Sequence, residues 1–484
     1  MTKLYRMSHK TAYIALMMMF LLSAFRVGAQ VPNEWEGKWW LGIISEASLP
    51  LNLTFAREGA DSSGLRPLIY SPTQSEKAIE PLTWTYRNDT LKMEVKSIGF
   101  KTTLRYRADS GNFEGTLRQN LLRTSITLEP SAGIYRINRP QEPREPYAYT
   151  EECLVLKHKD KYGDRIEVGV TITYPKGDGK YPCVILISGS GQQNRDEEVF
   201  GHKPFKLIAD YLTRNGVATL RYDDRGVGES SGSLSKMTTY TQADDAEWLF
   251  KWLKKHPKID RKRIGIIGHS EGGMIGPMIA ARNKDVAFVV MLAGPGCSGA
   301  EILRQQIVAM LRASGVEDEK LIDARDKWQK ICLESTFTHS PEQYDSIFKA
   351  AAKLLTKDMT NAERRAIGMT QYDAIVMAQQ MQSEWFRTFV KIDPKDYLTK
   401  LRCPVLAING EKDLQVLADE NLEAIAQYVR PSLLTERKFE NLNHLFQHCK
   451  KGLPSEYMLI EETMSEEVLV YLSQWVKATS KKIH

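Results

Sequence analysis

The sequence is poor in cysteine, and its few cysteines lie far apart. Its 484 residues hold six of them, at Cys153, Cys183, Cys297, Cys332, Cys403 and Cys449. They form no close pair and no cluster with histidine at the spacing typical of a zinc site. We therefore predict no metal centre, and the sequence leaves open which cysteines would pair as disulfides in an exported protein.

Long apolar runs are also scarce, and the one near the N-terminus is short. It covers Ala12 to Leu22, follows three basic residues and precedes the small residues Val27-Gly28-Ala29. This order predicts a signal peptide over residues 1–29, cleaved before Gln30. An uncleaved anchor helix, the alternative, needs about 20 apolar residues. We therefore expect a periplasmic or secreted protein with no stable membrane anchor after cleavage.

A long block of basic residues is missing as well. Lys and Arg number 66 against 60 Asp and Glu, and the two signs are interleaved, as between Lys251 and Arg263. Cleavage of the signal peptide would remove four positive charges and lower the formal net charge from +6 to +2. A nearly neutral chain of this kind indicates no nucleic-acid partner.

Residues 30–138 consist of short stretches that alternate apolar and polar residues, such as "LPLNLTFA", "TLKMEVK" and "FKTTLRYRA". Alternation with a period of two is typical of β-strands. Roughly eight strands predict a small all-β domain, either a lipocalin-like barrel or a sandwich. Its tryptophans could line a ligand groove, but we expect them to fill the core. Residues 139–150 hold three prolines and are predicted to be a linker.

From residue 151 to residue 484 the pattern changes to fully apolar runs separated by helical segments. Examples are "YPCVILISGSG", "RIGIIGHSEGG" and "CPVLAINGEKD". Such runs are typical of a parallel sheet that helices cover on both faces. In these sheets ligands bind beyond the carboxyl ends of the strands. We therefore expect the functional groups in the loops that follow these runs.

The strongest motif is Gly268-His269-Ser270-Glu271-Gly272-Gly273, between an apolar run and a helical one. In a G-x-S-x-G nucleophile elbow, the serine occupies a strained turn from strand to helix, and the glycines prevent steric clashes. A tight turn without chemistry is the alternative. The position between strand and helix favours Ser270 as a catalytic nucleophile.

Serine needs a positioned base, which in turn needs an acid. In hydrolases with this elbow the acid and then the histidine follow the serine along the chain. Asp413 follows the run "CPVLAI", and His444 follows the run "LLTERKFE". We predict Asp413 as the acid and His444 as the base, over Glu411 and His448 respectively.

An acyl-transfer site also needs N–H donors for the oxyanion. One is expected to be the backbone N–H of Glu271, and the other that of Ser190 or Gly191 in the loop "SGSGQQ". A phosphate-binding loop is the alternative, but the Lys-Ser/Thr pair of a Walker motif is absent.

Together "SGSGQQNRDE", "RYDDRGVGES", "GHSEGG", "CPVLAINGEKDLQV" and "NLNHLFQ" resemble the α/β-hydrolase superfamily, in its bacterial branch of serine-aminopeptidase-like hydrolases and carboxylesterases. The resemblance covers about residues 150–480, and it departs at Ser188, where a His-Gly pair is more usual. It implies an α/β-hydrolase domain whose cap is the helical segment at about 297–394. Trp385, Phe386 and Phe389 then either line the substrate pocket or belong to the cap core.

The expected function is hydrolysis of a small-molecule carboxylic ester through an acyl-enzyme, with no cofactor. A secreted peptidase of the same fold, similar to an aminopeptidase, would use the same machinery and is the main alternative. An inactive hydrolase that binds glycans is a third one, against which the complete set of Ser, Asp and His argues. The sequence leaves the natural substrate and the oligomeric state open.

Overall fold

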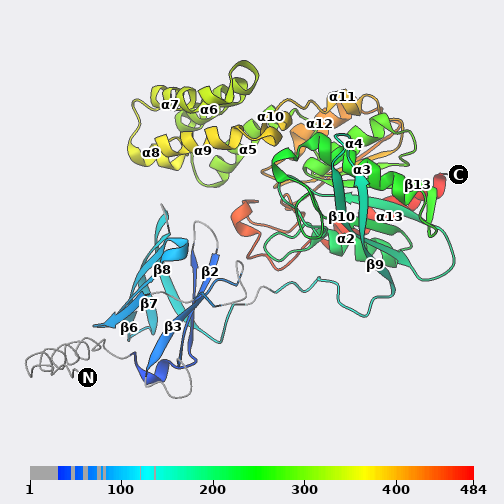
Figure 1. Cartoon of the computed structure of the whole chain (residues 1–484). Coiled ribbons are helices and arrows are strands. Elements are labelled where there is room, and N and C mark those ends of the chain that lie inside the picture. Colours follow the sequence, from blue (N-terminus) through cyan, green and yellow to red (C-terminus); the bar gives the residue numbers. More distant parts are fainter. Residues whose placement is uncertain are drawn as a thin grey trace, which may run out of the picture. The chain divides into compact units, whose positions relative to one another are not determined.

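A computed structural model describes residues 31–44, 49–57, 64–72, 78–79, 83–119, 122–135 and 138–483. The predicted signal peptide lies outside these residues. The chain divides into two compact units, one ending at Asn138 and one beginning at Arg139. We call them the β unit and the α/β unit (Figure 1). None of the helices that the structure describes is long and apolar enough to span a lipid bilayer.

The β unit is built on one antiparallel sheet in the order β3-β2-β1-β8-β7-β6-β5-β4. The first and last strands are neighbours, with Trp40 opposite Pro130, so the sheet curls back on itself and leaves its two edges at β3 and β4. This arrangement is a nearly closed barrel, and the sandwich alternative is wrong. The strands are β1 (Trp39–Ile44), β2 (Leu49–Arg57), β3 (Leu65–Tyr70), β4 (Thr83–Arg87), β5 (Thr90–Val95), β6 (Phe100–Arg107), β7 (Asn112–Gln119) and β8 (Leu122–Ser131).

Aromatic side chains fill the interior of the β unit. Trp35 is 2% exposed and meets five other rings at centroid distances of 4.6 to 5.6 Å: those of Trp40, Phe55, Tyr86, Tyr106 and Phe113. All five pairs are tilted or edge-to-face, the arrangements that the ring quadrupole favours. Trp35 and Trp40 are therefore core residues and not the wall of a groove.

The α/β unit contains a second sheet, in the order β16-β15-β14-β13-β11-β12-β10-β9. β10 is antiparallel to both of its neighbours, and the other pairs are parallel. The strands are β9 (Tyr149–Lys159), β10 (Arg165–Pro175), β11 (Tyr181–Ile187), β12 (Ala218–Tyr222), β13 (Ile259–His269), β14 (Val289–Leu292), β15 (Val405–Gly410) and β16 (Leu434–Phe439).

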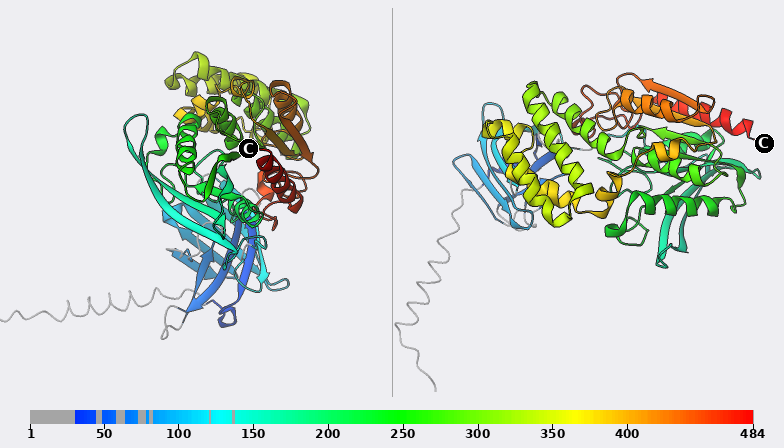
Figure 2. Two further views of the ribbon diagram at one scale, coloured as in Figure 1. Left: turned by 90° about the vertical axis from the view of Figure 1, so that its right-hand side faces the viewer. Right: turned by 90° about the horizontal axis from the view of Figure 1, so that it is seen from above.

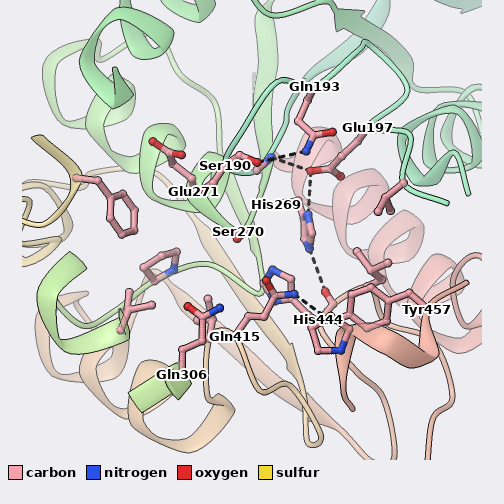
Figure 3. A pocket seen from close by; sticks show the side chains of 18 of the residues that line it. Ser190, Gln193, Glu197, His269, Ser270, Glu271, Gln306, Gln415, His444 and Tyr457 are labelled. Carbon is pink, nitrogen blue, oxygen red and sulfur yellow. Dashed lines mark hydrogen bonds and ion pairs between the residues drawn. The ribbon is translucent and has the colours of Figure 1, made fainter. Parts of the chain in front are cut away.

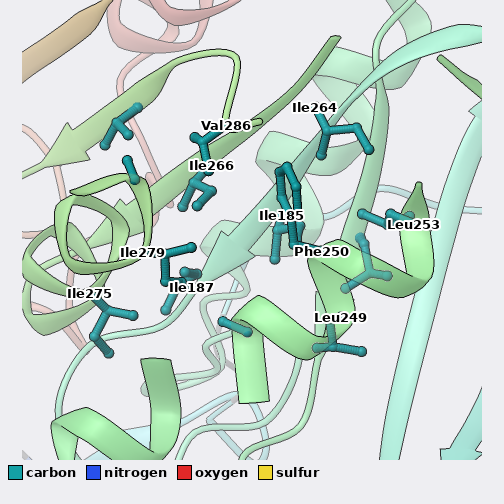
Figure 4. Close-up of a cluster of buried hydrophobic side chains, with 14 of the residues drawn as sticks. Ile185, Ile187, Leu249, Phe250, Leu253, Ile264, Ile266, Ile275, Ile279 and Val286 are labelled. Atoms are coloured by element: carbon teal, nitrogen blue, oxygen red, sulfur yellow. The ribbon is translucent and has the colours of Figure 1, made fainter. Parts of the chain in front are cut away.

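Helices cover both faces of this sheet. On one face α3 (Thr239–Leu253), α4 (Glu271–Arg282) and α12 (Ala418–Tyr428) pack on the strands through residues such as Phe250 and Ile275 (Figure 4). On the other face lie α2 (Pro204–Arg214) and α13 (Glu466–Lys482). Burial on both faces explains the unbroken apolar runs of the sequence. The prediction of an α/β-hydrolase fold after an all-β domain is confirmed.

Between β14 and β15 the chain forms a helical insertion with an apolar core of its own. Fully buried Trp328 and Phe348 belong to that core, and the indole N–H of Trp328 donates to the carbonyl of Phe348. Figures 1 and 2 show the helices of this insertion packed against one another. They are α5 (Gly299–Ala313), α6 (Glu319–Thr338), α7 (Tyr344–Leu355), α8 (Asn361–Ala366), α9 (Gln371–Met381) and α10 (Glu384–Phe389), before the short α11 (Lys395–Leu398).

The segment 139–150, predicted to be a linker, is bound to the α/β unit instead. The guanidinium of Arg139 donates to the backbone carbonyls of Phe200, Met458 and Ile460 at 2.7 to 2.9 Å. Glu142 pairs with Lys203 at 2.7 Å. The prolines of this segment predicted a free linker, but its polar side chains bind it to the α/β unit.

Candidate active site

The elbow has the strained geometry that the motif predicts. Ser270 is the single residue between β13 and α4, with φ 52° and ψ −119°, a conformation that costs a non-glycine residue about 1–3 kcal/mol. A Cβ on Gly268 would lie 1.9 Å from the carbonyl oxygen of Gly272, and one on Gly272 would lie 2.0 Å from that of Ile187. The turn therefore requires glycine at both positions.

Asp413 and His444 meet in the interior. Asp413 follows β15, and its Oδ1 accepts from the backbone N–H groups of Gln415 and Val416 at 2.8 and 2.9 Å. Its Oδ2 is left to face Nδ1 of His444 at 2.7 Å. Both side chains are almost fully buried. This bond selects the histidine tautomer whose lone pair is on Nε2.

The two rival residues lie elsewhere. Glu411 is exposed and accepts from the backbone N–H of Asn441 at 2.9 Å. The imidazole of His448 is 63% exposed and pairs with Glu462. Of the candidate acids and bases, the structure thus brings together Asp413 and His444, and His444 lines the same cavity as Ser270 (Figure 3).

Two of the three residues predicted to supply oxyanion donors, Glu271 and Ser190, line the same cavity as Ser270. Glu271 begins helix α4, so its backbone N–H has no partner within the helix. Ser190 lines the cavity on the opposite loop, whereas Gly191 is not among the lining residues. A Cβ on Gly189 would lie 3.1 Å from the Cβ of Ser270, so the glycine lets this loop approach the nucleophile closely.

The side chain of Glu271 has contacts that the sequence did not suggest. Its carboxylate is buried and accepts from the hydroxyls of Thr239 and Ser190 and from the indole N–H of Trp385 at 3.0 Å. Burial raises the pKa of this carboxyl above its ordinary value, although these donors oppose the shift. The residue after the nucleophile therefore connects the insertion helix α10 to the loop that carries Ser190.

The cavity above Ser270 has a volume of about 420 Å³ and is mostly apolar. The insertion contributes Ile302, Leu303, Trp385 and Phe389 to its wall, and no lysine or arginine is among the described residues that line it. Trp385 and Phe389 are stacked at 5.2 Å because positions i and i+4 share one face of a helix. Phe386 is not among the described lining residues and packs against the insertion core, so for this residue the cap-core alternative holds.

Two further lining residues escaped the sequence analysis. Glu197 and His269 are both buried at the floor of the cavity, and they bond to each other at 2.9 Å. Elsewhere, all six cysteines are free thiols, and no group of three metal-ligating side chains occurs among the described residues.

Residues 163–435, more than half of the chain, match the family model described as X-Pro dipeptidyl-peptidase (S15 family). The chain belongs to this S15 family. The expected resemblance to the α/β-hydrolase superfamily is thereby confirmed.

Three individual proteins are similar to this chain, each at less than 30% identity. Esterase EstD of Thermotoga maritima is 28% identical over 312 residues, which are 63% of this chain and 64% of the esterase, so the match spans less than two thirds of that protein. An α/β hydrolase of Penicillium sp., GrgF, has a TM-score of 0.43 at 13% identity, over 69% of this chain and 99% of its own. An esterase of Pyrococcus furiosus has a TM-score of 0.40 at 17% identity, over 71% and 98% respectively.

Proposed function

We propose that the protein is a serine hydrolase that cleaves carboxylic esters through an acyl-enzyme on Ser270. The observation that carries the proposal is the buried Asp413–His444 pair, whose histidine lines the same mostly apolar cavity as the elbow serine Ser270. A buried carboxylate on Nδ1 of an imidazole leaves Nε2 as a base and stabilises the imidazolium that forms.

In the proposed reaction, Oγ of Ser270 attacks the ester carbonyl while Nε2 of His444 takes the hydroxyl proton. The backbone N–H groups of Glu271 and Ser190 stabilise the oxyanion. His444 then returns the proton to the leaving alcohol as the C–O bond breaks. Water then attacks the acyl-enzyme while Nε2 of His444 takes a proton from it. His444 returns this proton to Oγ of Ser270 as the acyl C–O bond breaks and the acid leaves.

The wall of the cavity supports a neutral acyl group as the substrate. Its lining is mostly apolar. The charged groups among the described lining residues include the acidic side chains Glu197 and Glu271 but no lysine or arginine. An anionic substrate would lose its hydration there without gaining an unpaired counter-charge. We therefore expect neutral esters to react better than esters of dicarboxylic acids.

Peptide cleavage is the second candidate, because the family model that matches describes a dipeptidyl-peptidase. The attacking groups would be the same, and the difference lies in how the cavity holds the substrate. A catalytically inactive, glycan-binding protein is less well supported, since Asp413 bonds to His444, and His444 and Ser270 line one cavity.

The test is a substrate panel with an active-site probe. The protein is assayed on p-nitrophenyl esters of increasing chain length and on p-nitroanilides of amino acids and of X-Pro dipeptides, and it is labelled with a fluorophosphonate. We expect labelling that Ser270→Ala abolishes, and a higher kcat/KM on esters than on anilides. A higher kcat/KM on X-Pro anilides would make the protein a peptidase, and a folded protein without labelling would refute the serine mechanism.

A further inference from the structure

His269, the residue before the nucleophile, has a hydrogen-bond acceptor at each ring nitrogen. Its Nδ1 lies 2.9 Å from Oε1 of Glu197, and its Nε2 lies 3.0 Å from the backbone carbonyl oxygen of His444. Figure 3 draws both interactions as dashed lines. The ring is buried, so water has little access to either nitrogen.

This geometry determines the number of protons on the ring. A neutral imidazole has one N–H and one lone pair, and the lone pair would point at an acceptor and be repelled. Two donated bonds need two N–H groups. The same Oε1 of Glu197 also accepts from the backbone N–H of Gly189 at 2.7 Å, which favours the ionised carboxylate.

We propose that His269 is an imidazolium ion paired with the carboxylate of Glu197, and that this pair positions the active site. The pair ties together three segments: Gly189 in the oxyanion loop, His269 in the elbow and His444 after β16. The inference about positioning rests on the proposed function. His269 and Glu197 act through Ser270, His444 and the oxyanion donors, and neither takes part in the bond-making steps.

The surroundings of the ring fit a cation. Burial alone lowers the pKa of His269, but the carboxylate of Glu197, the carbonyl of His444 and the charge of Asp413 outweigh burial and hold the pKa above its ordinary value. Among the charged and titratable groups, Glu197, Asp413 and the His444 ring, whose centroid is 4.8 Å away, are those that face His269. Glu197 also has a φ of 51°, a strained backbone of the kind found at functional sites.

The sign of the pH effect follows from the raised pKa of His269. The ion pair holds the three segments in position while His269 keeps its proton. This positioning is lost as the pH rises through the pKa that His269 has in the folded state. Positioning should therefore fail on the alkaline side, as a fall in kcat with little change in KM.

A direct test reads the protonation state without any substrate. Nitrogen-15 NMR of the full-length protein with labelled histidine, nine residues in all, is recorded against pH, and His269→Gln assigns the signal. We expect His269 to show two protonated nitrogens at pH 7. A singly protonated, neutral ring at that pH would overturn the proposal, whether or not an esterase activity is found.

The functional test uses Glu197→Gln, which keeps an acceptor for Gly189 but removes the charge. We expect the alkaline limb of its kcat profile to move to lower pH by about one unit or more, with KM changed less than about two-fold. Glu198→Gln, at an exposed neighbouring carboxylate, is the matched control and should keep the wild-type profile. An unchanged profile in Glu197→Gln would refute the positioning role, and if this variant fails to fold, the NMR measurement still decides the charge.

Discussion

The two units of this protein each contain an eight-stranded sheet, but they differ in what they bury. In the β unit the interior is aromatic and aliphatic, and none of the Asp, Glu, Lys, Arg or His side chains described there is buried. In the α/β unit many charged groups are buried, including the pair Arg225–Asp245 at 2.6 Å as well as Glu197, Asp413 and Glu271. One sheet is stabilised by packing, and the other also encloses electrostatic networks.

The difference indicates where chemistry resides. Removing charged groups from water is unfavourable unless each is paired, so a domain without a site has no reason to retain them. Buried titratable groups with shifted pKa values therefore mark candidate sites. The charged residues around Ser270 satisfy this criterion and line or adjoin one cavity. Tyr86, beside Trp35, also has a pKa raised by burial and by Asp89, but its ring packs within the aromatic core.

Breaking the Asp413–His444 pair should have the largest effect on activity. Asp413→Asn keeps the shape of the side chain but favours the wrong imidazole tautomer, so kcat should fall roughly 10⁴-fold. Steady-state kinetics on a p-nitrophenyl ester measure this loss. Glu411→Gln, two positions earlier and exposed, is the control and should stay within about three-fold of wild type. Equal losses in both variants would mean that the acid is misassigned.

Trp35→Ala tests the β unit, whose sheet is stabilised by packing. Loss of this ring from the centre of five others should lower the unfolding free energy of the β unit by about 3–5 kcal/mol. Because the α/β unit has its own core, activity on small soluble esters should change less than about two-fold. Calorimetry should show an earlier transition for one unit only. A parallel loss of activity at temperatures where the variant is folded would show that the β unit completes the site.

The sequence predicted best those features that depend on local order along the chain. The elbow is recognisable because strand, glycines and serine are consecutive, and Asp413 and His444 because each follows a strand. The side chain of Phe386 was harder to place, since one step along a helix moves a residue to another face. The signal peptide lies outside the described residues and stays a prediction.

Contacts between distant residues could not be predicted in this way. Glu197 and His269 are 72 positions apart, and Trp385 and Glu271 are 114 positions apart. None of these four residues has a feature in the sequence that marks such a contact. Only the packing of the loops brings their polar atoms within bonding distance, and no periodicity in the sequence encodes that packing.

A smaller effect is expected from the segment 139–150, and it tests whether this segment stabilises the α/β unit. A chain that begins at Arg139 should keep the three bonds of its guanidinium, whereas one that begins at Pro146 loses them. Because charged donors to carbonyls are involved, we expect the shorter chain to be less stable by about 2–3 kcal/mol. Thermal unfolding of the two chains measures the difference. Equal stability would restore the interpretation of this segment as a free linker.

Asp224 gives the smallest expected effect, which depends on pH. Its carboxyl is buried beneath the oxyanion loop, where it accepts from the backbone N–H of Gln193 at 3.1 Å and from the hydroxyl of Ser188 at 3.4 Å. Burial, together with the nearby carboxylates of Glu271 and Glu197, raises the pKa of Asp224 to about 8. The folded state therefore favours the neutral acid, and the stability that this carboxyl contributes is lost as the pH rises from about 4 to about 8.

Asp224→Asn removes this titration, since an amide stays neutral at every pH in that range. Relative to wild type, the variant should be more stable at pH 8 than at pH 5 by at least about 1 kcal/mol, because only the wild type ionises a buried carboxyl in this range. The loss of one acceptor oxygen lowers the stability of the variant equally at both pH values. Urea unfolding at both pH values measures the difference. Asp210→Asn, a buried carboxylate on α2 that pairs with Arg214, serves as the contrast and should destabilise the protein or leave its stability unchanged at pH 8. A gain for Asp224→Asn that is the same at pH 5 and pH 8 would show that packing, and not the buried charge, governs this position.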